Sequence, residues 1–221
     1  RLRTAMAKLK LCVFISGRGS NLQSLIEACA DDSYPAKIAL VISNIDGIQG
    51  LERAKAAGIQ TSVINTKGFN SPSSVDTSII EAIKSFNVDL ICLAGYMRIL
   101  SDKFVDHWQD RMINIHPSLL PSFKGLDVQQ RAIDAGVRFS GCTVHYVRRE
   151  MDTGPIILQA AVPVMNNDSA ETLAERILKQ EHKIYPLAVK LIAQGRITIK
   201  NECVLIDGAI NPGSILINPE A

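Results

Sequence analysis

The sequence predicts an α/β fold with a doubly wound, mostly parallel sheet and a late antiparallel hairpin. Three observations predict it. Apolar runs alternate with helical stripes through the first half of the chain, and these runs are continuous, as in strands buried on both faces. The second half adds two strand-like runs joined by a short polar turn. Alternating strands and helices imply right-handed crossovers and helices on both faces of the sheet.

The first half of the chain supplies the strands of the expected parallel sheet and the helices between them. The apolar run at 9–16 ends in Gly-rich residues, as a buried strand should, and Leu22, Leu25 and Ile26 then follow a helical stripe over 21–30. The pattern then repeats. We expect further strands at 37–43, 60–65, 88–95 and 111–116, and further helices at 50–58, 75–86 and around 103–108.

The second half changes character. Residues 141–147 and 155–164 predict two strands that add to the sheet as a hairpin, joined by the polar turn RREMDTG. Asp168 and Glu171 resemble a capping box and predict the start of a long helix, which Pro186 should kink or restart. Two short apolar runs, RITIK and CVLID, predict a small terminal hairpin.

Composition restricts the function. A chain of 221 residues, 47% hydrophobic, can bury a sizeable core, and its net charge of +2 comes from scattered residues that predict neither a nucleic-acid nor a membrane partner. The five cysteines form no CxxC pair and are odd in number, so we expect no metal and no disulfide framework. Without a long apolar stretch or a signal-type segment, the expected location is cytoplasmic.

Residues 16–21, SGRGSN, lie where the first strand gives way to the first helix. Glycines there let backbone N–H groups approach an anion, and the helix start adds partial positive charge, so phosphate is the natural ligand. The loop lacks the GK[ST] of a Walker A motif and, with Leu22, the third Gly of a dinucleotide motif, which favours a phosphomonoester. The alternative is a tight turn with Ser20 as helix N-cap.

Asn114 and His116 stand two residues apart at the end of an expected strand. They should share one face of it, while Ile113 and Ile115 pack on the other. Pro117 then ends the strand, which places an amide and an imidazole at the edge where open α/β sheets keep their active sites. The alternative is that both side chains satisfy loop carbonyls.

Two carboxylates can serve the same edge. If the late hairpin folds over the rim, Asp152 in its turn pairs with His116 and favours the imidazolium, a general acid or oxyanion stabiliser; otherwise Asp152 is a turn former. Glu181 falls on the apolar stripe of the last helix, where it lies at the stripe's edge or faces a polar cavity. The histidines we expect to be structural are His107, His145 and His182.

Residues 94–100, AGYMRIL, follow the most apolar expected strand and emerge at the same rim. Apolar side chains beside one Arg can line a slot for a flat, partly apolar ligand, with backbone hydrogen bonds at its edge. Core packing is the competing explanation.

Together these motifs resemble the glycinamide ribonucleotide transformylases, folate-dependent enzymes of purine synthesis. SGRGSNLQ, AGYMRIL, NIHPSLLP, MDTGPIILQ and QEHKIYP occur in that order and at that family's spacing, from residue 9 to about 199. The resemblance implies a formyltransferase domain at 9–200. We expect a tag or disordered start at 1–8 and a C-terminal tail at 201–221.

The resemblance also implies a reaction: the amine of glycinamide ribonucleotide attacks the formyl carbon of 10-formyltetrahydrofolate. Asn114 and protonated His116 would meet the tetrahedral oxyanion, and Asp152 would keep His116 charged and help manage the proton lost from the amine. The residues implied to bind the phosphate and ribosyl end are Gly19, Ser20, Asn21 and Glu181. Those implied to bind folate are Met97, Arg98, Ile99, Leu100, Asn114, Arg148, Arg149, Glu150 and Met151. The implied partners are these small molecules, with no metal, and the implied assembly is a monomer or homodimer.

Two departures from the family pattern stand out. Members commonly continue PGLHTH where this chain has KGLDVQQ, so Asp127 and Gln129 replace two histidines near a mobile loop. Residues 71–74, SPSS, occupy the place of an expected basic residue, so contact with the folate glutamate tail should be weaker or come from elsewhere.

Three rival functions remain. A 10-formyltetrahydrofolate hydrolase would use the same catalytic residues on water but carries an additional N-terminal domain, for which we expect no room. Methionyl-tRNA formyltransferase needs a separate C-terminal domain for RNA, against which the short tail and weak charge argue. A non-catalytic phosphosugar-binding protein would not need Asn114, His116 and Asp152 together.

Overall fold

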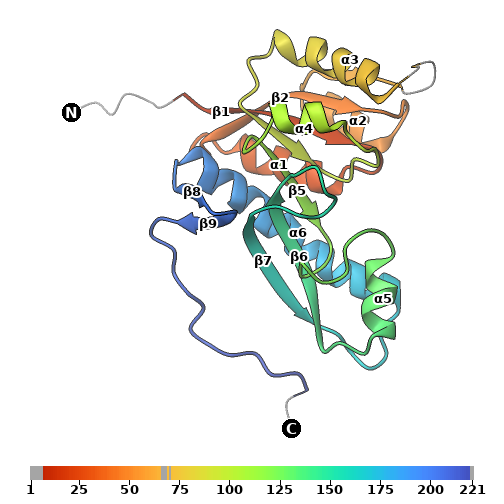
Figure 1. Ribbon diagram of the computed structural model, residues 1–221, viewed down its shortest axis with the longest axis vertical. Helices are drawn as coiled ribbons and strands as arrows, with labels where there is room; N and C mark the ends of the chain where they lie inside the picture. Colours follow the sequence, from red (N-terminus) through yellow and green to blue (C-terminus); the bar gives the residue numbers. More distant parts are fainter. Residues whose placement is uncertain (1–6, 66–68, 70, 220–221) are drawn as a thin grey trace.

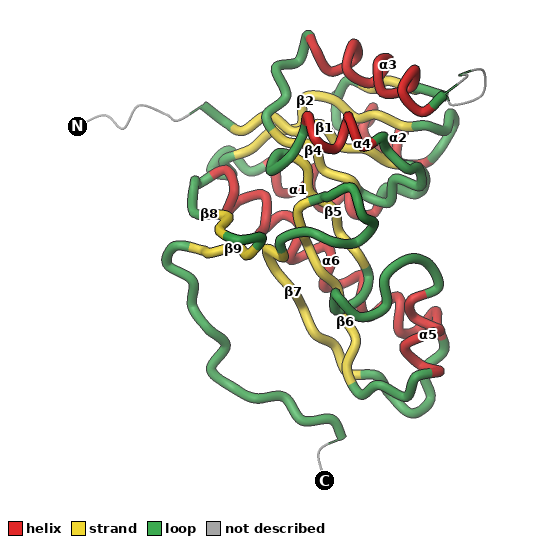
Figure 2. Tube along the Cα trace, in the orientation of Figure 1, coloured by secondary structure: helices red, strands yellow, loops and turns green. Residues whose placement is uncertain are grey.

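Helices cover both faces of a seven-stranded sheet in the computed structural model, which describes residues 7–65, 69 and 71–219 (Figures 1 and 2). Most of the expected tag-like start therefore lies outside the described residues. The sheet strands are β1 (Leu9–Ile15), β2 (Ala36–Ser43), β3 (Thr61–Val63), β4 (Leu90–Leu93), β5 (Met112–His116), β6 (Phe139–Tyr146) and β7 (Ile156–Pro163). The helices are α1 (Ser20–Ala30), α2 (Gln49–Ala56), α3 (Pro72–Lys84), α4 (Asp102–His107), α5 (Val128–Asp134) and α6 (Ala170–Ala193). A separate antiparallel pair, β8 (Ile197–Lys200) and β9 (Cys203–Ile206), follows α6.

The strand order β3-β2-β1-β4-β5-β6-β7 confirms the predicted sheet. Neighbours from β3 to β5 pair in parallel, and β6 pairs antiparallel with both β5 and β7. The chain moves outward from β1 to β3 and then returns to the other side of β1 to form β4. Ligands of open α/β sheets bind outside the carboxyl ends of the strands at such a reversal.

The side chains of β1 divide between two layers. Leu11, Val13 and Ile15 pack in the layer that also contains buried residues of α1 and α6. Cys12 and Phe14 pack in the opposite layer with residues of α3 and α4. All five side chains are fully buried, which explains why this strand reads as a continuous apolar run.

Helix α6 runs through Pro186 without a break, so the predicted restart at that residue is wrong. Tertiary contacts hold this stretch in place. The Tyr34 hydroxyl donates to the Pro186 carbonyl (2.7 Å), and the buried Tyr185 hydroxyl donates to the Leu93 carbonyl at the end of β4 (2.7 Å). These contacts offset the helical hydrogen bond that proline cannot donate. None of the described helices is both long and apolar enough to cross a membrane.

Two further predictions of helix starts are corrected. The N-cap of α6 is Ser169, whose side chain forms a capping box with Thr172, rather than Asp168 with Glu171. Helix α3 begins at Pro72 rather than Val75, because Ser71 caps it by accepting from the Ser74 N–H. The SPSS segment is therefore the cap and first turn of a helix.

Helix α5 has no counterpart among the predicted elements. It is only 7 residues long, and its buried residues are Val128 and Ala132, too few for a visible apolar stripe. Strand β6 starts at Phe139, two residues before the predicted start. Gly141 in this strand allows β7 to approach, since a Cβ there would lie 1.9 Å from the Ala160 carbonyl oxygen.

Candidate active site

The loop after β1 presents backbone N–H groups at the start of α1. Gly19 is the helix N-cap, with a left-handed φ of 71°, and no side chain caps this end. Ser20 is the first helical residue, so the alternative in which Ser20 is the N-cap is wrong. The first amides of a helix have no partner within it and carry partial positive charge. This end of α1 therefore has the geometry of an anion site.

Asn21 joins this loop to the last helix. Its Nδ2 donates to Glu181 Oε2 (3.0 Å), and Glu181 is 6% exposed, so the carboxylate faces a buried polar contact within the apolar stripe of α6. Burial raises the pKa of Glu181, and the hydrogen bond from Asn21 opposes that rise. The Asn21 Oδ1 is buried and has no hydrogen-bond partner among the described residues. The structure thus brings residues 19–21 and Glu181 together.

His116 and Asp152 are paired, as the sequence predicts. Their Nδ1 and Oδ1 atoms lie 3.5 Å apart, and the two side chains are 8% and 9% exposed. Asp152 has a left-handed φ of 52° in the turn between β6 and β7, and its Oδ2 accepts from the Gly125 N–H (2.7 Å). The His116 Nε2 lies 3.0 Å from the Phe123 carbonyl oxygen, so this nitrogen carries a proton. Protein groups therefore occupy both ring nitrogens.

Asn114 contacts a histidine that the sequence analysis treats as structural. Its Nδ2 lies 3.4 Å from His145 Nε2, and the two residues are paired across β5 and β6. The His145 Nδ1 lies near the carbonyl oxygens of Tyr146 (2.9 Å) and Thr153 (3.2 Å), which places the ring proton on Nδ1. Burial lowers the pKa of His145 and so favours the neutral ring, whose Nε2 is then an acceptor for the Asn114 amide. One amide hydrogen of Asn114 remains for a ligand.

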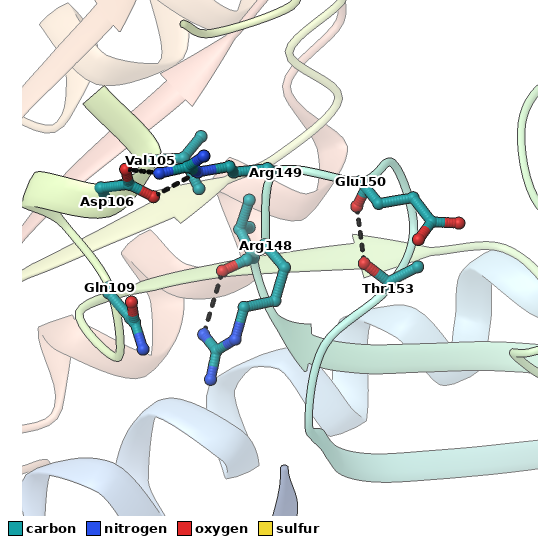
Figure 3. A pocket seen from close by; sticks show the side chains of 8 residues that line it. Val105, Asp106, Gln109, Arg148, Arg149, Glu150 and Thr153 are labelled. Carbon is teal, nitrogen blue, oxygen red and sulfur yellow. Dashed lines mark hydrogen bonds and ion pairs between the residues drawn. The ribbon is translucent and has the colours of Figure 1, made fainter. Parts of the chain in front are cut away.

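A cavity of about 450 Å³ lies between α4 and the turn after β6 (Figure 3). Its lining residues are Val105, Asp106, Gln109, Val147, Arg148, Arg149, Glu150 and Thr153. Three of the predicted folate-binding residues, Arg148, Arg149 and Glu150, are among them. The other predicted residues do not line it: Met97, Arg98, Ile99, Leu100, Asn114 and Met151. The described residues include no group of His, Cys, Asp or Glu side chains arranged to hold a metal ion.

Ion pairs that the sequence analysis missed hold the arginines of this turn. Arg148 binds Asp110 (2.8 Å) and Glu202 in the β8–β9 turn (2.7 Å). Arg149 binds Asp106 of α4 through both carboxylate oxygens, and this pairing lowers the pKa of Asp106. The turn that carries Asp152 is thus anchored on both sides. No local sequence signal predicts these pairs, because their members are 38 to 54 residues apart.

The 97–100 segment lies at the rim, outside the cavity. Met97 and Ile99 are 70% and 75% exposed, whereas Leu100 is buried. The Met97 N–H donates to Ser16 Oγ (2.8 Å), and this hydroxyl donates to Asn44 Oδ1 (2.5 Å). The loops after β1, β2 and β4 therefore meet at the reversal of strand order.

Comparisons with known proteins show that the chain is similar to formyl transferases and to part of a purine biosynthetic protein. The family model described as formyl transferase matches residues 9–189. The chain is 46% identical over 205 residues to the phosphoribosylglycinamide formyltransferase of Haemophilus influenzae, covering 93% of this chain and 97% of that protein. It is 50% identical over 192 residues to the trifunctional purine biosynthetic protein adenosine-3 of Bos taurus, covering 87% of this chain but spanning only 19% of that protein. The crystal structure of glycinamide ribonucleotide transformylase 1 from Symbiobacterium toebii matches with a TM-score of 0.88 at 43% identity, covering 92% and 95% of the two chains.

Proposed function

The chain belongs to the formyl transferase family, and from that premise we propose that it transfers the formyl group of 10-formyltetrahydrofolate to the amine of glycinamide ribonucleotide in purine biosynthesis. The observation that carries this proposal is the buried pair of His116 and Asp152, with Asn114 on the same strand as His116. These residues supply hydrogen-bond donors and a proton carrier in one place, which acyl transfer to an amine requires.

The ribonucleotide would bind across α1 and α6. Backbone N–H groups of Gly19, Ser20 and Asn21 would hold its phosphate, where the partial positive charge of the helix start favours an anion. Glu181 would accept hydrogen bonds from the ribosyl hydroxyls or the glycinamide end. The contact between Asn21 and Glu181 supports this arrangement, because it fixes the distance between the two sub-sites.

The chemistry would proceed by addition and elimination. The substrate amine forms a bond to the formyl carbon, and the carbonyl electron pair moves to oxygen. The free Asn114 amide hydrogen and the His116 Nε2–H would stabilise that oxyanion. The Nε2–H must exchange the Phe123 carbonyl for the substrate oxygen to do so. The oxyanion electron pair then re-forms the carbonyl as the bond from the formyl carbon to folate N10 breaks. The former amine loses a proton and N10 takes one up, and His116 and Asp152 would carry that proton from the amine to N10.

The reduced folate would use the cavity between α4 and the 148–153 turn. Its volume of about 450 Å³ is that of a small-molecule site. Val105 and Val147 offer apolar contact to a pterin ring, while Gln109 and Glu150 offer polar groups to its edge. Residues 97–100 would contact the part of the folate that leaves the cavity along the rim.

An absorbance assay of 10-formyltetrahydrofolate, run with and without glycinamide ribonucleotide, tests the proposal. Wild-type protein should deformylate the folate only when the ribonucleotide is present, and His116→Ala should lose this turnover. Turnover that is independent of the amine would indicate a hydrolase instead. Absence of turnover in both conditions would overturn the enzymatic assignment.

A further inference from the structure

Helix α2 makes two hydrogen bonds to consecutive carbonyls of the loop after β1. The Gly50 N–H donates to the Gly17 carbonyl oxygen (3.1 Å). The Arg53 Nε–H donates to the Arg18 carbonyl oxygen (2.9 Å). Both bonds act on the loop from its α2 side, although α2 contributes no residue to the site described above.

These bonds determine which way the loop amides point. In a trans peptide the C=O and the N–H of the next residue point in opposite directions. A bond that draws the Arg18 carbonyl toward α2 therefore turns the Gly19 N–H away from α2. The bond to the Gly17 carbonyl fixes the preceding peptide plane in the same way. The loop is thus held in one conformation by donors behind it.

The helix approaches the loop closely enough that only glycine fits. A Cβ at Gly50 would lie 2.6 Å from Ile15 Cδ1 and 2.9 Å from the Gly17 carbonyl oxygen. A Cβ at Gly19 would lie 2.7 Å from the Gly50 Cα. The backbone of the loop therefore packs directly on the backbone of α2. If the Arg53 donor is removed, the loop has no space to move closer to α2 and form a replacement hydrogen bond.

Arg53 also reaches the helix that the loop precedes. Its Nη1 lies 3.4 Å from Gln23 Oε1 on α1, so one guanidinium spans the loop carbonyl and the first turns of α1. The planar guanidinium presents these donors in a fixed geometry, which the single ammonium of lysine cannot reproduce.

We propose that Arg53 is a positioning residue for phosphate recognition: it orients the Gly19 N–H toward the substrate phosphate without contacting the phosphate itself. The inference rests on the proposed function, in which this loop binds the phosphate, and it adds a residue of α2 to the determinants of substrate affinity. It predicts an effect on binding and little effect on the chemical step.

Three variants test this proposal: Arg53→Ala, Arg53→Lys and, as a matched control, Lys55→Ala. Lys55 is an exposed cation on the same helix and pairs only with Glu52 among the described residues, at 3.3 Å. Arg53→Ala should raise the KM for glycinamide ribonucleotide roughly tenfold, the effect of about one lost hydrogen bond, with kcat within about twofold. The inhibition constant of inorganic phosphate should rise by the same factor. Lys55→Ala should change neither, and Arg53→Lys should restore little.

Two outcomes would overturn the inference. One is an unchanged phosphate inhibition constant in Arg53→Ala. The other is full restoration by Arg53→Lys with an affinity that falls steeply with salt, which would show that the cation itself attracts the phosphate. Calorimetric titration of each variant with inorganic phosphate separates this test from the proposed function. If wild-type protein binds phosphate and Arg53→Ala binds it roughly tenfold more weakly, the inference holds even if no formyl transfer is found.

Discussion

Asp152 serves two partners at once, since it faces His116 with one oxygen and accepts from the Gly125 N–H with the other. Asp152→Asn keeps the shape of the side chain but removes its charge. We expect kcat to fall about 10²- to 10⁴-fold, the range for loss of acid–base assistance, with a smaller change in the KM of either substrate. The absorbance assay measures both. Asp46→Asn, at an exposed position, is the control, and equal activity of Asp152→Asn and wild type would remove Asp152 from the mechanism.

The buried carboxylate of Glu181 should lower the stability of the folded protein while it strengthens binding of the ribonucleotide. The pKa of Glu181 is raised in the folded state. As pH rises, the carboxyl group therefore loses its proton first in the unfolded state. The free energy of unfolding then falls as pH rises above about 4.3, the pKa of Glu in an unfolded chain. Glu181→Gln removes this loss and can still accept from Asn21. We expect the variant to gain stability over wild type as pH rises through that window and to keep the gain at pH 7, while its KM for the ribonucleotide rises roughly tenfold.

Urea unfolding of Glu181→Gln and wild type at pH 4, 5, 6 and 7 measures the predicted difference. If the free energies of unfolding of the two proteins change with pH in parallel, burial of the Glu181 carboxylate does not reduce stability. An unchanged KM would separately show that this carboxylate does not contact the substrate.

His145 should stay neutral with its proton on Nδ1. Burial depresses its pKa, and the Tyr146 and Thr153 carbonyls accept from Nδ1, which leaves Nε2 to accept from Asn114. Ring nitrogen NMR shifts near pH 7 identify the tautomer directly. A proton on Nε2 would contradict this assignment and reverse the Asn114 amide.

The depressed pKa of His145 also predicts a pH dependence of stability. As pH falls, the unfolded state binds a proton at His145 before the folded state does, so the free energy of unfolding should decrease below about pH 6.5.

At the scale of single elements, the start of α6 depends on Asp168. Its carboxylate binds Arg176 (2.6 Å) and accepts from the Met165 N–H (2.7 Å), and these contacts lower the pKa of Asp168. Asp168→Asn should reduce the free energy of unfolding by about 1–3 kcal/mol at pH 7, the cost of weakening hydrogen bonds to a charged group. The difference should begin to shrink as pH falls below about 4, because Asp168 then takes up its proton first in the unfolded state, and it is lost fully only as pH falls through the depressed pKa of the folded state.

Urea unfolding at pH 7 and pH 3 measures this effect. Glu171→Gln is the control, because Glu171 is an acidic residue in the first turn of α6 and is exposed. Equal losses from the two substitutions would show that helix charge, and not the Asp168 contacts, stabilises this end.

The sequence pattern predicts an element correctly when its apolar run or helical apolar stripe is long. Strands β1, β2 and β4 and helix α6 bury enough residues for their patterns to be visible, and their positions were predicted to within a few residues. Helix α5 is too short for that signal. The continuation of α6 through Pro186 depends on tertiary contacts from Tyr34 and Tyr185, which no local pattern contains.

At the scale of the whole molecule, the site is predictable where it depends on strand ends. The alternation along β5 and the reversal of strand order bring Asn114, His116 and the loop at 16–21 to one rim, and both features follow from sequence pattern. The contact of Asn114 with His145 depends on the register of β5 against β6, which is set only when the sheet assembles. The sequence does not predict the cavity residues of α4 either, because their position depends on how α4 packs over the assembled sheet.

The hydrogen bond between Asn21 and Glu181 joins residues 160 positions apart. During synthesis on a ribosome, the loop after β1 emerges long before the helix that completes it. The nascent chain can pair β1 with β2 early, yet it must wait for α6 as far as Glu181 before the proposed substrate pocket exists. The proposed activity should therefore appear late and abruptly during translation, because a chain that ends before Glu181 lacks the residue that completes the pocket.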